Sequence, residues 1–88
     1  MKINENFNLR KIADTWVVLP VGKATLDFTG ILTLNESAVM LWNLLLKGAE
    51  REELVSAITS EYDVTYEEAL VDVDEFIEKL KDAKCIDM

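Results

Sequence analysis

The sequence contains no histidine and a single cysteine among its 88 residues. Without histidine, the chain lacks the side chain that most often serves as general base and as metal ligand near neutral pH. The lone cysteine, Cys85, cannot form a disulfide within the chain, and only Lys84 stands beside it to activate the thiol. We therefore expect Cys85 to be a packing residue, and we predict that the protein is not an enzyme.

Glycine is scarce as well. The three glycines, Gly22, Gly30 and Gly48, are isolated, so the sequence has no glycine-rich loop to hold a phosphate. The carboxylates are numerous, but they follow helical spacing rather than forming the dense loop of oxygen donors that calcium needs. The sequence predicts no catalytic residues, no metal and no cofactor.

Long apolar runs are missing. The longest covers residues 39–46 and is interrupted by Asn43, far below the roughly 20 residues that span a bilayer. The first six residues are largely polar and do not resemble the apolar segment of an export signal. We expect a soluble, cytoplasmic protein with no membrane partner.

Basic side chains are outnumbered, with 9 Lys and Arg against 17 Asp and Glu and a net charge of −8. The excess lies in residues 35–88, which carry five basic and fourteen acidic side chains, whereas residues 1–34 carry four and three. Proteins bind nucleic acids by replacing condensed counterions with Lys and Arg. The charge balance therefore argues against a nucleic-acid partner.

Two early segments have the composition of strands. Residues 16–19 are apolar and end at Pro20, which cannot donate a hydrogen bond within a sheet. Residues 7–12 are a weaker candidate, because Arg10 and Lys11 interrupt the alternation of polar and apolar side chains.

The third strand pattern is the clearest. Residues 26–34 alternate, with Leu32 and Leu34 on the apolar face and Ile31 as the exception on the polar face. Either Ile31 is an isolated surface residue, or it contacts a molecule that docks on this strand. We expect this strand to lie at the edge of a three-stranded antiparallel sheet.

Helical patterns fill the remainder. Asn35 is a good N-cap for a first helix, and Gly48 is suited to its C-terminal end. A second helix is expected over residues 50–62. Thr65 and Glu68 form a capping box at the start of a third helix that runs to about residue 83. Its apolar stripe is broad enough to meet more than one surface; the stripe comprises Ala69, Leu70, Val73, Phe76, Ile77 and Leu80.

Three strands followed by three helices predict an α+β fold, arranged like a winged helix-turn-helix and forming one domain over residues 1–88. The third strand carries little of the charge that usually protects an open edge. An open edge beside an apolar helix stripe can accept a peptide as an added strand. Alternatively, the third helix covers this edge, and spacing alone leaves both arrangements open.

The sequence resembles the PqqD family, which belongs to the wider group of recognition elements for ribosomally synthesised, modified peptides. The resemblance covers residues 7–86, and its ordered combination of segments is more specific than any one of them. The segments are LRKIA at 9–13, WVVLP at 16–20, FTGILTLNE at 28–36, LWNLL at 41–45 with Gly48, and VDVDEF at 71–76 with Leu80. The chain departs from the family at its end, where Lys84-Cys85-Ile86 replaces a Gly-Leu-Ile-like segment.

The resemblance implies a non-catalytic peptide chaperone. Such a protein binds the leader segment of a precursor peptide as a strand added to the third strand, against the third helix. It then presents the precursor to a modifying enzyme, such as a radical SAM enzyme, a cyclase or a protease. The strand side of the site would be Phe28, Thr29, Gly30, Ile31, Leu32 and Thr33. The helix side would be Leu70, Val73, Asp74, Ile77 and Lys81.

Core packing is an alternative role for several of these residues, and Phe28, Leu32 and Val73 fit it best, together with Phe76 in the same stripe. Ile31, Asp74 and Lys81 are the stronger candidates for peptide contact. Nothing in the sequence identifies pyrroloquinoline quinone as the product. A homodimer through the same strand edge also stays open.

Two other functions compete with leader binding. A winged-helix DNA-binding module would need a basic recognition helix, but residues 66–84 hold seven acidic and three basic side chains. A structural subunit could instead hold an enzyme through the first or second helix. Exposure of Trp42 would favour that hypothesis, and burial would weaken it.

Overall fold

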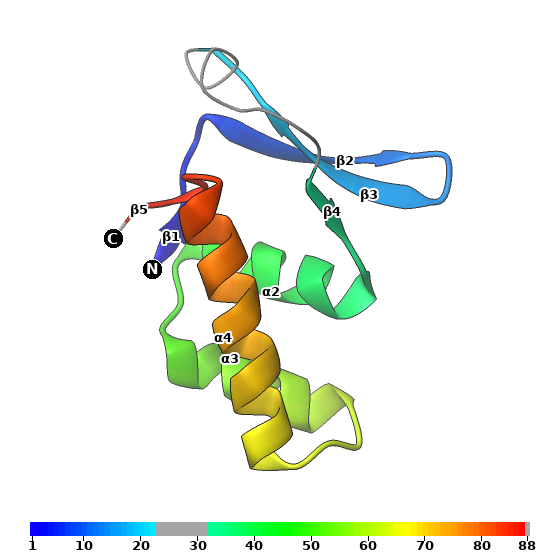
Figure 1. The fold of residues 1–88 in the computed structure, drawn as a ribbon, viewed down its shortest axis with the longest axis vertical. Helices are drawn as coiled ribbons and strands as arrows, with labels where there is room; N and C mark the ends of the chain where they lie inside the picture. Colours follow the sequence, from blue (N-terminus) through cyan, green and yellow to red (C-terminus); the bar gives the residue numbers. More distant parts are fainter. Residues whose placement is uncertain (23–31, 88) are drawn as a thin grey trace.

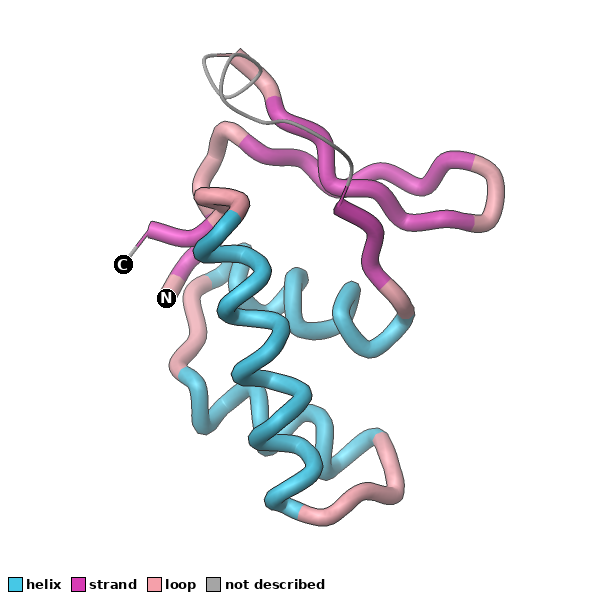
Figure 2. The backbone as a smooth tube through the Cα atoms, viewed as in Figure 1, coloured by secondary structure: helices cyan, strands magenta, loops and turns pink. Residues whose placement is uncertain are grey.

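The computed structural model describes residues 1–22 and 32–87. A three-stranded antiparallel sheet is followed by three helices (Figure 1), which confirms the predicted α+β fold. The sheet lies at one end of the helices, and the two ends of the chain meet beside it (Figure 2).

The sheet has the order β2-β3-β4, formed by β2 (Phe7–Ile12), β3 (Thr15–Pro20) and β4 (Leu32–Leu34). The first two strands match the two early segments predicted as strands, including the weaker candidate at residues 7–12. The described part of the third strand pattern pairs with β3 through Trp16 opposite Leu34 and Val18 opposite Leu32. The rest of that pattern, residues 26–31, lies outside the described residues.

A two-residue turn joins β2 to β3. Ile12 pairs with Thr15, so Ala13 and Asp14 form the loop. Ala13 has φ of 56°, in the left-handed region that favours glycine. A non-glycine residue there costs about 1 kcal/mol or slightly more, so this turn stores a small backbone strain.

Helix α2 (Glu36–Lys47) begins and ends as its sequence predicts. The Asn35 side chain accepts a hydrogen bond from the Ala38 amide at 2.9 Å. At the other end, Gly48 has φ of 96° and its amide donates to the Leu45 carbonyl at 3.2 Å. Both caps satisfy backbone groups that the helix itself leaves without partners.

Helices α3 (Arg51–Glu61) and α4 (Tyr66–Asp82) follow. The predicted capping box of α4 is confirmed, because the Glu68 amide donates to the Thr65 hydroxyl and the Thr65 amide donates to the Glu68 carboxylate, each at 3.1 Å. A second capping box, formed by Glu50 and Glu53, begins α3 and was not predicted.

A separate two-stranded sheet, absent from the sequence prediction, joins the ends of the chain. It pairs β1 (Lys2–Ile3) with β5 (Ile86–Asp87) in antiparallel register. Next to it, the Asn4 amide donates to the Cys85 carbonyl at 2.6 Å. Ile3 and Ile86 are both buried, so this small sheet closes one side of the core.

The core lies where the three helices meet and continues under the sheet. Trp42, Leu45, Leu54 and Leu80 are its largest fully buried side chains, and Val18 carries it into the sheet. These residues come from all three helices and from the central strand. Leu34 of β4 and Phe76 of α4 belong to the same buried cluster, which connects the sheet to the helices.

Candidate functional site

Strand β4 forms one edge of the three-stranded sheet. It pairs with β3 on one side, and residues 1–22 and 32–87 provide no strand on the other. Leu34 is buried, Leu32 is half-buried and Thr33 is exposed. This edge therefore has the geometry that accepts an additional strand.

A groove of about 220 Å³ lies between β4, the start of α2 and α4. We call it the β4–α4 groove. Its floor is apolar and includes Leu34, Leu41 and Phe76, all buried. The remaining lining residues are Thr33, Asn35, Ser37, Ala38, Ile58, Asp72, Glu75 and Lys79.

One flank of α4 provides the charged wall of this groove. Asp72, Glu75 and Lys79 lie three and four residues apart, so they share one face of the helix with Phe76. The wall thus carries two carboxylates and one ammonium group above an apolar floor. It can select an extended segment by the size of its side chains and by their charge.

The predicted site residues fall into four groups. Leu32 and Thr33 lie in β4, beside the groove, whereas residues 28–31 lie outside the described residues. Val73 and Ile77 are buried, with exposed fractions of 0% and 7%, and belong to the core cluster.

The other three predicted helix residues do not line the β4–α4 groove either. Leu70 is half-buried against the core, and Asp74 and Lys81 are exposed. The α4 residues that do line it are Asp72, Glu75, Phe76 and Lys79, and the sequence prediction included none of them among the peptide contacts. The spacing defines the apolar stripe of α4, but both flanks of that stripe look alike in the sequence.

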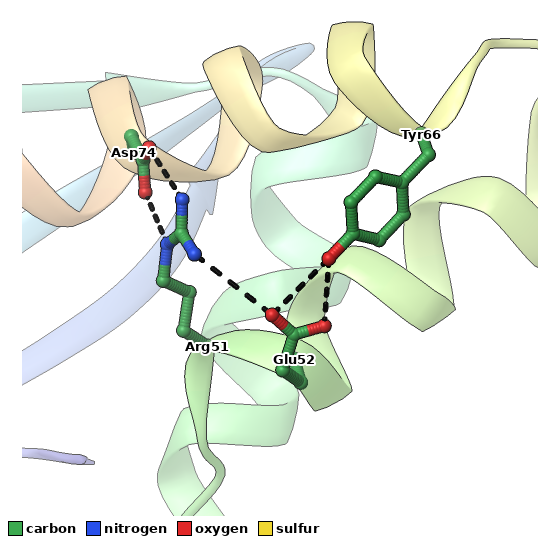
Figure 3. Close-up of polar contacts among 4 residues, drawn as sticks. All are labelled: Arg51, Glu52, Tyr66 and Asp74. Atoms are coloured by element: carbon green, nitrogen blue, oxygen red, sulfur yellow. Dashed lines mark hydrogen bonds and ion pairs between the residues drawn. The ribbon is translucent and has the colours of Figure 1, made fainter.

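Asp74 is engaged in a polar cluster that joins α3 to α4 (Figure 3). Arg51 donates from Nε to Asp74 Oδ1 at 2.6 Å and from Nη2 to Oδ2 at 2.8 Å. The Tyr66 hydroxyl donates to the Glu52 carboxylate at 3.0 and 3.2 Å. Arg51 also lies 3.8 Å from Glu52, which links the two pairs.

These contacts shift the pKa values of three side chains. The hydrogen bond from Arg51 lowers the pKa of Asp74, and the same bond raises the pKa of Arg51. The hydrogen bond to Glu52 raises the pKa of Tyr66. All three groups are exposed to solvent, so the cluster links α3 to α4 at the surface without forming a buried charged site.

The side chain of Cys85 is fully buried, which confirms the expected packing role. Burial raises the pKa of its thiol to about 11. Because the thiolate is the nucleophile, this thiol is poorly reactive at neutral pH.

Trp42 is 1% exposed. Its burial weakens the hypothesis of a structural subunit that contacts an enzyme through this residue. Among the described residues, no three His, Cys, Asp or Glu side chains gather as a metal site would require. None of the helices in the described ranges is long and apolar enough to cross a membrane.

Comparison with solved structures supports the fold. TbiB1 in complex with the TbiA(beta) leader peptide is 27% identical, with a TM-score of 0.76 over 97% of this chain and 93% of that chain. Lasso peptide synthetase B1 complexed with the leader peptide is 22% identical, with a TM-score of 0.72 over 92% of this chain and 89% of that chain. The second likeness concerns the fold alone.

Comparison with curated proteins gave no significant match. Comparison with protein families matched residues 15–86 to the family described as coenzyme PQQ synthesis protein D, PqqD. The match spans β3, β4 and all three helices, and so includes both walls of the β4–α4 groove. The chain therefore belongs to the PqqD family.

Proposed function

We propose that this chain is a non-catalytic recognition protein for the leader segment of a ribosomally synthesised precursor peptide. It binds the leader as a strand added to β4 and presents the precursor to a modifying enzyme in the cytoplasm, where the peptide is made. A radical SAM enzyme, a cyclase or a protease would serve as that enzyme. The proposal applies to modified peptides generally and does not require pyrroloquinoline quinone as the product.

The observation that carries the proposal is the edge of β4, which pairs with no second strand among residues 1–22 and 32–87, beside an apolar-floored groove. Backbone groups on such an edge supply hydrogen bonds to any extended peptide, and the groove selects among side chains. A volume of about 220 Å³ is below the roughly 300–1,000 Å³ of pockets that enclose small-molecule ligands. It suits the side chains of a peptide that lies along the edge.

The similar solved structures support a leader peptide as the ligand. TbiB1, the more similar of the two solved structures, was determined with a leader peptide bound. Its fold covers nearly the whole of this chain, including the β4–α4 groove. We therefore propose a leader peptide, rather than an unrelated extended segment, as the ligand here.

A binding role without catalysis fits the chemistry of the groove. The hydroxyl of Ser37 is the groove's candidate nucleophile on α2, but it donates to the Asn35 side chain at 2.9 Å and so supports the helix cap. The thiol of Cys85 is buried elsewhere, with a raised pKa. We accordingly assign the chemical steps to the partner enzyme.

The test is a fluorescence-anisotropy titration with leader peptides of the precursors encoded beside this chain. We expect saturable binding to one of these leaders and none to the same residues in scrambled order. Replacing Glu75 with Lys should change the affinity, because this side chain lines the groove. Replacing Glu78 with Lys, the matched change on the exposed face of α4, should not. Equal binding of native and scrambled leaders would refute the proposal.

A further inference from the structure

A second groove lies at the opposite edge of the sheet, between β2 and α2. It has a volume of about 600 Å³ and is lined by consecutive residues of β2, from Phe7 to Lys11, together with Trp16 of β3. On the α2 side it is lined by Val39, Trp42, Asn43 and Leu46, which repeat along one face of that helix. We call it the β2–α2 groove.

The two grooves have the same construction. Each joins an edge strand of the sheet to a helix, and α2 lines both of them. Ala38 and Leu41 face the β4–α4 groove, whereas Val39 and Leu46 face the β2–α2 groove. The two grooves share no lining residue, so a molecule in one groove does not occupy the residues of the other.

Their charges are opposite. The β2–α2 groove contains Arg10 and Lys11 and no acidic residue among the described residues that line it. The β4–α4 groove contains two carboxylates and one ammonium. In a chain of net charge −8, the β2–α2 groove is a local cationic surface that favours an acidic partner.

The rim of the β2–α2 groove adds apolar contact area. Leu46 on α2 is 48% exposed, and Ile12, next to the groove on β2, is 55% exposed. The Lys11 ammonium lies 5.7 Å from the centre of the Trp16 ring, so the aromatic ring holds this charge beside the groove. An acidic segment that also carries an apolar side chain matches both features.

Charge also narrows the choice of partner. A two-fold dimer through this groove would bring Arg10 and Lys11 of both copies into one interface, and this concentration of like charge is unfavourable. Two cations also neutralise too few phosphates for nucleic-acid binding by a chain this acidic. The partner that this charge favours is therefore a different protein, with a surface that is both acidic and apolar.

We propose that the β2–α2 groove docks an acidic segment of the enzyme that modifies the precursor peptide. This inference rests on the proposed leader-binding function, since the enzyme must hold the chain while the leader occupies the opposite edge of the sheet. The leader and the enzyme then contact the two faces of α2.

The test uses the full chain, the purified peptide-modifying enzyme encoded beside it, and the cognate leader peptide. Enzyme affinity is measured by isothermal titration calorimetry and leader affinity by fluorescence anisotropy. The variants are the double change Arg10→Glu with Lys11→Glu, and Leu46→Glu. Val71→Glu on α4 is the matched control for Leu46, because Val71 is 56% exposed and lines neither groove. Circular dichroism checks that each variant is folded.

We expect the double reversal and Leu46→Glu each to weaken enzyme binding by about tenfold or more. Both should leave leader affinity within about twofold of wild type, as should the Val71 control for both ligands. Unchanged enzyme affinity would overturn the inference, and so would a parallel loss of leader affinity. A wild-type chain that binds the leader but not the enzyme would overturn it as well.

The leader-binding proposal can be refuted independently of this docking inference. If the wild-type chain binds the enzyme through Arg10 and Lys11 but binds no leader, the leader-binding proposal is refuted while this docking surface stands. Self-association of the wild-type chain that the double reversal abolishes, seen by analytical ultracentrifugation, would identify a second copy as the occupant and refute the enzyme as partner.

Discussion

Phe76 and Val73 occupy neighbouring turns of α4 but have different surroundings, and this difference tests the location of the binding site. Phe76 lies on the floor of the β4–α4 groove and is 7% exposed, whereas Val73 is fully buried and does not line the groove. The sequence had placed Val73 among the peptide contacts and favoured core packing for both residues. We compare Phe76→Leu with Val73→Ala.

Both changes should destabilise the fold by similar amounts. Val73→Ala removes two methyl groups from a site without solvent contact, which costs about 2 kcal/mol including the cavity that remains. Phe76→Leu replaces a ring by a smaller apolar side chain and costs about 1–2 kcal/mol. A domain of this size is typically stable by roughly 5–15 kcal/mol, so both variants should stay folded.

Leader affinity should separate the two variants. Loss of the Phe76 ring hollows the groove floor and removes dispersion contacts with a bound side chain, which we expect to cost about 1 kcal/mol, or roughly fivefold in Kd. Val73→Ala should leave Kd within about twofold. Urea denaturation gives the stabilities, and anisotropy titration of the folded proteins gives Kd. If Val73→Ala weakened binding as much as Phe76→Leu, the groove would be assigned to the wrong flank of α4.

Three further predictions concern strain, charge and thiol reactivity. Ala13→Gly should stabilise the protein by up to about 1 kcal/mol, seen as a higher Tm, because glycine adopts the positive φ of Ala13 without strain; a lower Tm would contradict this reasoning. Asp74→Asn should reduce stability at neutral pH, since the pKa of Asp74 in the folded chain lies below its ordinary value of 3.8. The stabilisation is present above that value and is lost as pH falls through the lowered pKa, so urea denaturation curves of variant and wild type should converge as the pH falls below 3.8. Cys85 should react with a thiol reagent at pH 8 only as fast as the core opens, and rapid labelling of folded protein would show that its thiol is accessible.

Local patterns were sufficient to predict most of the fold. The capping residues Asn35 and Thr65 determine where α2 and α4 begin, through hydrogen bonds to amides within the next few residues. The alternation in β4 likewise reflects one face on the core, whereas the apolar run in β3 reflects burial on both faces, since the adjacent residues Val17 and Val18 are both buried. These signals are contained within a few neighbouring residues, so the sequence displays them directly.

The features that escaped prediction depend on contacts between distant residues. Strands β1 and β5 are two residues each, too short to show a period, and they form because the two ends of the chain meet. Which flank of α4 faces β4 is likewise determined by contacts between residues far apart in the sequence. Arg51 pairs with Asp74 on one flank, while the other flank, with Glu75, turns toward β4. Helical spacing gives both flanks the same signature.

The central claim is that the leader binds as a strand along the edge of β4, and backbone methylation of the leader tests it most directly. In an added strand, alternate peptide amides donate to the edge and the intervening amides point away from it. We predict that N-methylation of one alternating set abolishes binding in the anisotropy titration, whereas methylation of the other set preserves it. Equal effects of the two sets would contradict strand addition.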